Sequence, residues 1–263
     1  MRLKSYLAVS RISFKNTLAY RSNLIFYTLG TLLQLLLMLA VWSALDKQGA
    51  LGPDLNFKKL STYSALGFSL NIGFSVFYIY GYLTELIRKG DLAMELVRPV
   101  EFMKNLLFRY FGFSVFRIGF LALPFWLLCN VVLGLQAPPD VPTALAFVLS
   151  IALAYLVNYF VFFLFALLTF ISLDNSGIMM TFMSISTLFT GLYLPFWIFP
   201  DWLRGVAEIL PFKAIYFTPI SLYMGTMPVG EALAFQGAWL LALVLLSQGL
   251  WKLMMRRIVV QGG

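Results

Sequence analysis

Residues 23–45 read NLIFYTLGTLLQLLLMLAVWSAL, and this long apolar run without a charged residue decides the fold class. An α-helix rises about 1.5 Å per residue, so about 20 apolar residues cross the hydrocarbon core of a bilayer. The composition agrees, because 61% of the 263 residues are hydrophobic and only 11% are charged. A soluble domain of this length needs far more charge to cover its surface. The sequence therefore predicts an all-α membrane protein.

Further stretches are also long and apolar enough to cross a membrane. They cover residues 60–83, 111–133, 144–170, 178–199 and 231–254. We therefore expect six transmembrane helices, which together make one membrane domain of residues 23–263.

The N-terminal residues 1–22 form a separate segment with an amphipathic pattern. Lys4, Arg11 and Lys15 recur on one side of a helix, and apolar residues such as Leu3 and Leu7 lie on an adjoining side. This pattern predicts an N-terminal interfacial helix. A basic segment that merely flanks the first span is the alternative.

Residues 200–228 hold two short amphipathic pieces, 201–210 and 213–223, separated by Pro211. Each is too short to span a bilayer. Their aromatic side chains are typical of the headgroup boundary. We expect short external re-entrant helices here, directly before the last span.

The distribution of Lys and Arg orients the chain. These residues concentrate in the N-terminal segment, between the second and third spans, and in the C-terminal tail, while the opposite side holds fewer of them. Because positive residues favour the cytoplasmic side, we expect both termini in the cytoplasm. Arg117, near the cytoplasmic start of the third span, is expected to extend to the interface. The net charge of +8 fits contact with lipid headgroups. The sequence has no basic stripe with interleaved aromatic residues, so it does not predict nucleic-acid binding.

Catalytic, metal-binding and nucleotide-binding patterns are missing from the sequence. The chain has no His, and its one cysteine, Cys129, lies in an apolar run. This excludes Ser/His and Cys/His catalytic pairs and predicts no metal site. No phosphate-binding loop is present, so we expect no nucleotide cofactor in this chain. The predicted spans also lack a central carboxylate for ion coupling. Energy for uphill movement would have to come from another polypeptide.

Uncharged polar residues interrupt the second and fifth predicted spans. Lipid tails cannot satisfy such groups, so they should face a water-filled path or another helix. We expect that these residues line a pathway: Ser69, Asn71, Tyr78, Thr181, Ser184 and Thr187. Hydrogen bonds between packed helices are the alternative role.

The most charged part of the chain follows the second span and contains residues 86–100, LIRKGDLAMELVRPV. Gly90 and Asp91 can end one helix and cap the next. Leu92 and Leu96 then share one face of a short helix that Pro99 ends. Such a helix either docks a soluble partner or lies on the membrane surface.

The pattern IRxGDLAxELVRP in this segment resembles a signature of the bacterial ABC-2 type exporter permeases, as does AYRSN at residues 19–23. The resemblance implies a multi-pass protein of the bacterial inner membrane that exports a hydrophobic or amphipathic substrate. It implies a separate cytoplasmic ATPase that binds ATP and Mg²⁺, and a second permease subunit, identical or related. It further implies that residues 86–99 couple to the ATPase through Gly90, Asp91, Leu92, Glu95, Leu96 and Arg98.

Two functions from different classes therefore remain. One is an exporter permease, and the other is a membrane assembly or scaffold protein that transports nothing. A membrane-embedded enzyme ranks below both, because no catalytic constellation is present.

Overall fold

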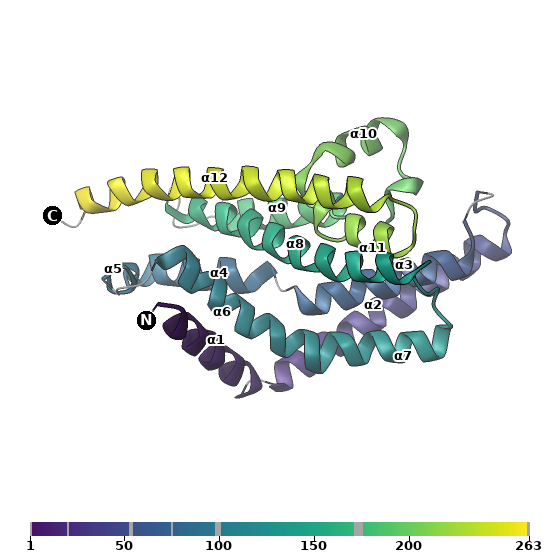
Figure 1. Cartoon of the computed structure of the whole chain (residues 1–263), viewed down its shortest axis with the longest axis horizontal. Coiled ribbons are helices and arrows are strands. Elements are labelled where there is room, and N and C mark those ends of the chain that lie inside the picture. The colour runs from purple at the N-terminus through teal and green to yellow at the C-terminus, as the bar shows by residue number, and fades with distance from the viewer. Residues whose placement is uncertain are drawn as a thin grey trace.

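The computed structural model describes residues 2–19, 21–52, 55–74, 76–97, 101–170 and 176–261, and these ranges contain helices and no strand. Long helices run side by side along the molecule (Figure 1). Both ends of the chain and the short helix α5 (Leu92–Leu96) lie at one end, and α10 (Asp201–Ile209) lies toward the other.

Five helical stretches in the described ranges are long and apolar enough to cross a membrane. They are 22–47, 57–89, 102–133, 141–166 and 229–256. These correspond to α2 (Arg21–Lys47), α3 with α4 (Phe57–Gly73 and Val76–Lys89), α6 with α7 (Phe102–Arg117 and Leu123–Leu133), α8 (Val141–Ala166) and α12 (Val229–Gln261). Five of the six predicted spans are thereby confirmed by length and composition.

The region of the predicted fifth span contains α9 (Ser176–Phe189), which has only 14 residues. At about 1.5 Å per residue, α9 alone is shorter than a hydrocarbon core of about 30 Å. The chain nevertheless returns through the bundle, since α8 ends near the termini and α12 begins at the opposite end (Figure 1). Residues 176–228 make this return with α9, the turns η3 (Phe196–Ile198) and η4 (Pro211–Ala214), α10 and α11 (Phe217–Tyr223). Of the two short pieces expected around Pro211, the first is confirmed as α10, and the second is divided into η4 and α11.

Two irregularities interrupt the central helices at the same depth. The second span breaks after α3, where Phe74 has an extended backbone. The third span contains a π-helical turn, η1 (Ile118–Ala122). A Cβ on Gly73 would lie 2.9 Å from the side chain of Ile118, so the glycine allows the two irregular segments to touch. Such π-turns are often found at functional sites.

Helix α1 (Arg2–Ala19) packs across α6 with small and polar residues. Its buried side chains recur at helical spacing and are Tyr6, Ser10, Ser13 and Thr17. Leu3 and Leu7, by contrast, are exposed. The expected helix is present, but its buried face is the small polar one, because small side chains let two helices approach closely.

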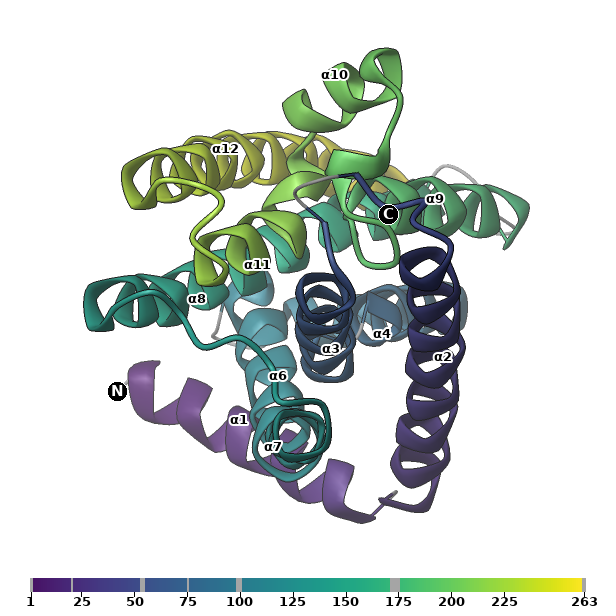
Figure 2. The same ribbon diagram turned by 90° about the vertical axis from the view of Figure 1, so that its right-hand side faces the viewer.

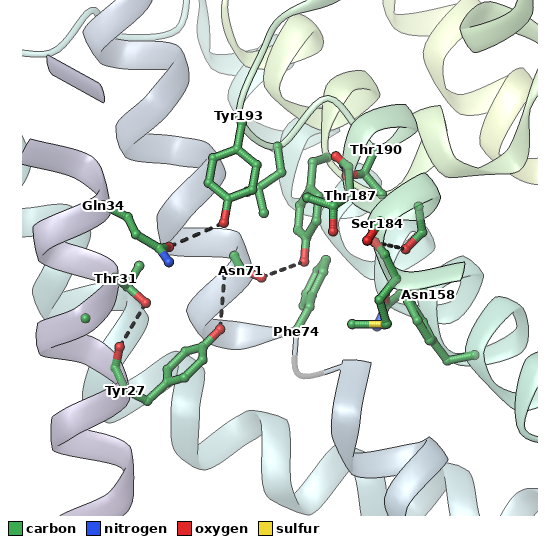
Figure 3. A pocket seen from close by; sticks show the side chains of 16 residues that line it. Tyr27, Thr31, Gln34, Asn71, Phe74, Asn158, Ser184, Thr187, Thr190 and Tyr193 are labelled. Atoms are coloured by element: carbon green, nitrogen blue, oxygen red, sulfur yellow. Dashed lines mark hydrogen bonds between the residues drawn. The ribbon is translucent and has the colours of Figure 1, made fainter. Parts of the chain in front are cut away.

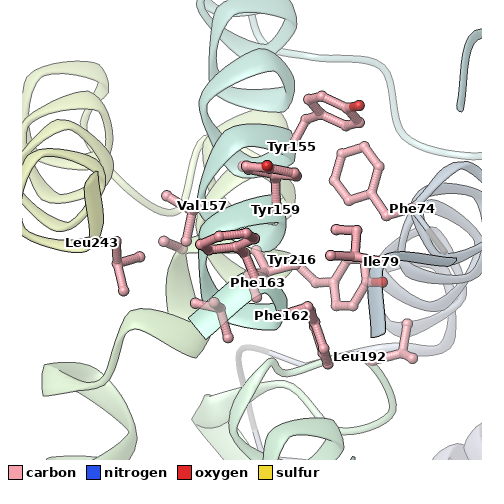
Figure 4. Close-up of a cluster of buried hydrophobic side chains, with 14 of the residues drawn as sticks. Phe74, Ile79, Tyr155, Val157, Tyr159, Phe162, Phe163, Leu192, Tyr216 and Leu243 are labelled. Carbon is pink, nitrogen blue, oxygen red and sulfur yellow. The ribbon is translucent and has the colours of Figure 1, made fainter. Parts of the chain in front are cut away.

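Helix α8 packs against α4, α11 and α12, and Figure 2 shows it beside α11 and below α12. It contributes Tyr155, Tyr159, Phe162 and Phe163 to a buried aromatic cluster (Figure 4). Polar contacts fix its position as well. Gln236 of α12 donates to the carbonyl oxygens of Ser150 and Ala214 at 3.1 and 2.9 Å. Buried amides thus join helices that are far apart in sequence.

Candidate functional site

A pocket of about 560 Å³ lies between α2, α3, α8 and α9 and is lined mainly by uncharged polar and aromatic side chains (Figure 3). Its walls also include the segment after α9 and Tyr216. No cluster of His, Cys, Asp or Glu that could hold a metal ion occurs in the described ranges. The lining can form hydrogen bonds and apolar contacts with a bound molecule.

Asn71 lies where three walls of the pocket meet. Its side-chain amide donates to the Tyr27 hydroxyl at 3.2 Å, and it accepts from the Tyr216 hydroxyl at 3.3 Å. Tyr193 similarly donates to Gln34 at 3.4 Å (Figure 3). These distances are at the long end of the hydrogen-bond range, so a ligand with better geometry can replace such bonds.

The α9 wall presents hydroxyl groups that are already satisfied within their own helix. Ser184 donates to the carbonyl oxygen of Met180 at 3.0 Å, and Ser186 donates to that of Met183 at 3.0 Å. Thr187 also lines the pocket. A hydroxyl bonded in this way keeps lone pairs that can accept from a ligand.

The pathway residues expected from sequence fall in different places. Asn71, Ser184 and Thr187 line the pocket. Ser69 instead donates to the carbonyl oxygen of Ala65 at 2.6 Å, and the exposed Thr181 donates to that of Gly177 at 3.0 Å.

Tyr78, the remaining expected residue, lies outside the pocket wall. Its ring stacks on Phe113 with centroids 4.3 Å apart, and its hydroxyl lies 3.1 Å from that of Ser13. Tyr78 therefore joins α4 to α6 and α1. This is the alternative role considered for these polar residues, contact between packed helices.

The first span supplies pocket residues that the sequence reasoning missed. Tyr27, Thr31 and Gln34 of α2 line the pocket together with Asn158 of α8. A signal was available, because spacings of four and three place the three α2 residues on one face of a helix.

Helix α5 turns two of its expected coupling residues toward the bundle. Leu92 is 5% exposed and belongs to the main apolar core. Glu95 is 8% exposed, and its carboxylate lies 3.8 Å from Arg109 and accepts from Tyr82 and Asn105 at 3.5 Å each. Both side chains anchor α5 to its own chain, so in this state neither offers a surface to a partner.

The outward side of α5 consists of other residues. Met94 is 67% exposed and Val97 is 85% exposed, and Leu96 lies at the edge of this surface. Gly90 ends α4 with φ of +74°, a left-handed conformation that glycine adopts without strain. The backbone carbonyl of Asp91 accepts from the Glu95 N–H. Arg98 lies outside the described residues.

Arg117 does not extend to the interface as expected. Its side chain is only 3% exposed, and its Nε–H donates to the carbonyl oxygen of Ile72. The guanidinium also lies over the rings of Tyr27 and Phe113, at 4.6 and 5.3 Å from their centroids. The reason is the break after α3, which leaves the Ile72 carbonyl without its usual partner in a continuous helix.

The comparisons with known proteins agree with this architecture. A family model described as ABC-2 family transporter protein matches residues 28–262, which is most of the chain. A comparison with curated proteins gave no match. The extent of the family match and the apolar helices lead to one conclusion: the chain belongs to the ABC-2 family of transporter proteins and is a membrane-spanning permease of that type.

Proposed function

We propose that this permease is the membrane subunit of an ATP-driven exporter, and that the pocket between α2, α3, α8 and α9 receives its cargo. The observation that carries the proposal is a cavity of about 560 Å³ with hydroxyl and amide groups in its wall, enclosed by strongly apolar helices. In a bilayer, such groups are unfavourable unless they serve a path or a ligand. The mixed lining fits a hydrophobic or amphipathic substrate.

The proposed topology has six crossings with both termini in the cytoplasm of a bacterial inner membrane. The sixth crossing is made by α9 together with residues 190–200. Support comes from the common end shared by the termini and α5, together with the concentration of Lys and Arg there (Figure 1). In this arrangement α1 is interfacial, and α10, η4 and α11 are external re-entrant elements.

The proposed partners are a cytoplasmic ATPase, which supplies ATP and Mg²⁺ chemistry, and a second permease subunit. Residues 86–99 would couple to the ATPase, and the exposed apolar side chains Met94 and Val97 support contact through the outward side of α5. Helix α2 stands at the edge of the bundle and is largely exposed (Figure 2). This exposure supports contact with lipid and with a second subunit, either identical or related.

The test is transport by the chain co-purified with a candidate ATPase subunit. Inside-out proteoliposomes should accumulate at least one lipid, peptide or amphipathic drug from a panel, and only with ATP. Asn71→Leu should lower this accumulation, because Asn71 joins three walls of the pocket. Thr181→Val is the matched control, since Thr181 is exposed and bonded within α9. If the ATPase associates and no compound moves, the scaffold function is correct instead.

A further inference from the structure

Arg117 carries a buried charge that has no counter-ion among the described residues. Its partners are the Ile72 carbonyl, the ring and hydroxyl of Tyr27 and the ring of Phe113, and it forms no ion pair with any residue in the part of the chain described. Its Nη2 atom is buried and has no hydrogen-bond partner there. A buried charge in a membrane helix is costly and is a functional site by default. An anion beside the Nη2 atom would supply the partner that the described residues do not.

The place of Arg117 indicates where that anion would come from. Tyr27, which covers the guanidinium, is itself a wall of the 560 Å³ pocket. Ser114 and Ile118, on the same span as Arg117, line a second cavity of about 460 Å³ between α6 and α8. Phe74 lies in the walls of both cavities. Phe74 therefore separates a polar pocket from an apolar one, and Arg117 lies behind Tyr27 of the first pocket, on the span that supplies Ser114 and Ile118 to the second.

The two cavities differ in a way that fits one kind of molecule. The first offers hydroxyl and amide groups, and the second is lined almost wholly by apolar side chains. No Asp or Glu is among the described residues that line either cavity, so an anion meets no like charge there. An alkyl chain suits the second cavity, and an oxyanion suits the first, beside Arg117.

We propose that the cargo site binds an anionic amphiphile, with Arg117 as the counter-ion of its carboxylate or phosphate head and the α6–α8 cavity as the site of its alkyl tail. This assignment rests on the proposed function, because it names the substrate class of the same pocket. Tyr27 has to move off the guanidinium before the head group can reach it. Phe74 has to move as well, so that one molecule can occupy both cavities.

The experiment measures binding of probes that share one alkyl chain and differ only in the head. The full-length purified chain in a non-ionic detergent is titrated with oleate, oleyl phosphate, oleyl alcohol and oleylamine. At least one anionic probe should bind at least about tenfold more tightly than the alcohol and the amine, since hydrogen bonds to charged groups are the stronger class. Whichever of oleate and oleyl phosphate binds more tightly shows whether the preferred head group is a carboxylate or a phosphate. Equal binding of all the probes would overturn the proposal.

Two variants assign the preference to Arg117. Arg117→Gln should abolish the preference for the anionic probe and leave binding of oleyl alcohol unchanged, and Arg117→Lys should keep part of it. Arg204→Gln removes the same charge from an exposed residue that pairs with Glu208 at 2.8 Å, so it should bind as the wild type does. An anion preference that survives Arg117→Gln, or that Arg204→Gln also removes, would contradict the assignment. If Arg117→Gln does not fold, Arg117→Lys and the wild-type probe series decide the question.

The binding assay needs no ATPase, so its outcome is separate from that of transport. Anion-selective binding that depends on Arg117 supports the site even where vesicles show no ATP-dependent movement. In that case only the exporter function fails. If vesicles transport neutral amphiphiles and the binding assay shows no preference for anions, the exporter function stands and the proposed anion site is wrong.

Discussion

Gly112 shows how a single side chain position decides the placement of α1. A Cβ at this position would lie 2.0 Å from the carbonyl oxygen of Ser10, so only glycine lets the two helices cross this closely. Gly112→Ala should therefore destabilise the protein by about 1–3 kcal/mol, the usual cost of overpacking. The measurement is thermal unfolding in detergent, together with protease sensitivity of the N-terminal segment.

A matched control for this prediction exists in α4. A Cβ on Gly81 would meet no atom within 4 Å, so Gly81→Ala should leave the unfolding temperature unchanged or raise it slightly. Equal destabilisation by the two substitutions would show that close packing of α1 on α6 is not what Gly112 provides.

The two sides of helix α5 lead to opposite expectations at the scale of the element. Leu92 lies in the core, so Leu92→Ala should lower the free energy of unfolding by about 2–5 kcal/mol. Val97 is exposed, so Val97→Asp should leave stability unchanged and weaken association with the ATPase. Unfolding curves of the permease and co-purification with the ATPase measure the two effects separately. Wild-type association of a Val97→Asp, Met94→Asp double variant would show that the outward side of α5 is not the coupling surface.

Glu95 has a different role from that of a surface contact in this arrangement. Its carboxylate accepts hydrogen bonds from Tyr82 and Asn105 and faces Arg109, which lies on α6. Glu95→Ala should free α5 from α6 and leave Arg109 without this anion. We expect lower coupling between ATP hydrolysis and transport, with ATP hydrolysis itself retained. Glu95→Gln, which keeps the hydrogen-bond acceptor, should be milder in the same assay.

The number of membrane crossings is a property of the whole molecule. It depends on whether the short helix α9 crosses together with residues 190–200, and reporter fusions can measure this. If α9 with residues 190–200 crosses the membrane, a reporter after residue 225 is external and one at the C-terminus is cytoplasmic. Reporters after residues 50 and 138 should also be external, and one after residue 95 cytoplasmic. A cytoplasmic signal at residue 225 with an external C-terminus would establish five crossings instead.

The sequence by itself determined that the chain is an all-helical membrane protein, where five long spans lie, and to which family its charged connection belongs. These properties depend on composition and on the length of apolar runs, which are local. Only the tertiary structure decided that Tyr27 and Gln34 line the pocket while Thr181 does not, and that Leu92 is inside while Val97 is outside. It also decided the burial of Arg117, whose partner is a carbonyl freed by the break in another span. The physical reason is that the face a membrane helix buries depends on neighbours distant in sequence, since lipid tails and protein interiors are similarly apolar and the hydrophobic pattern does not distinguish them.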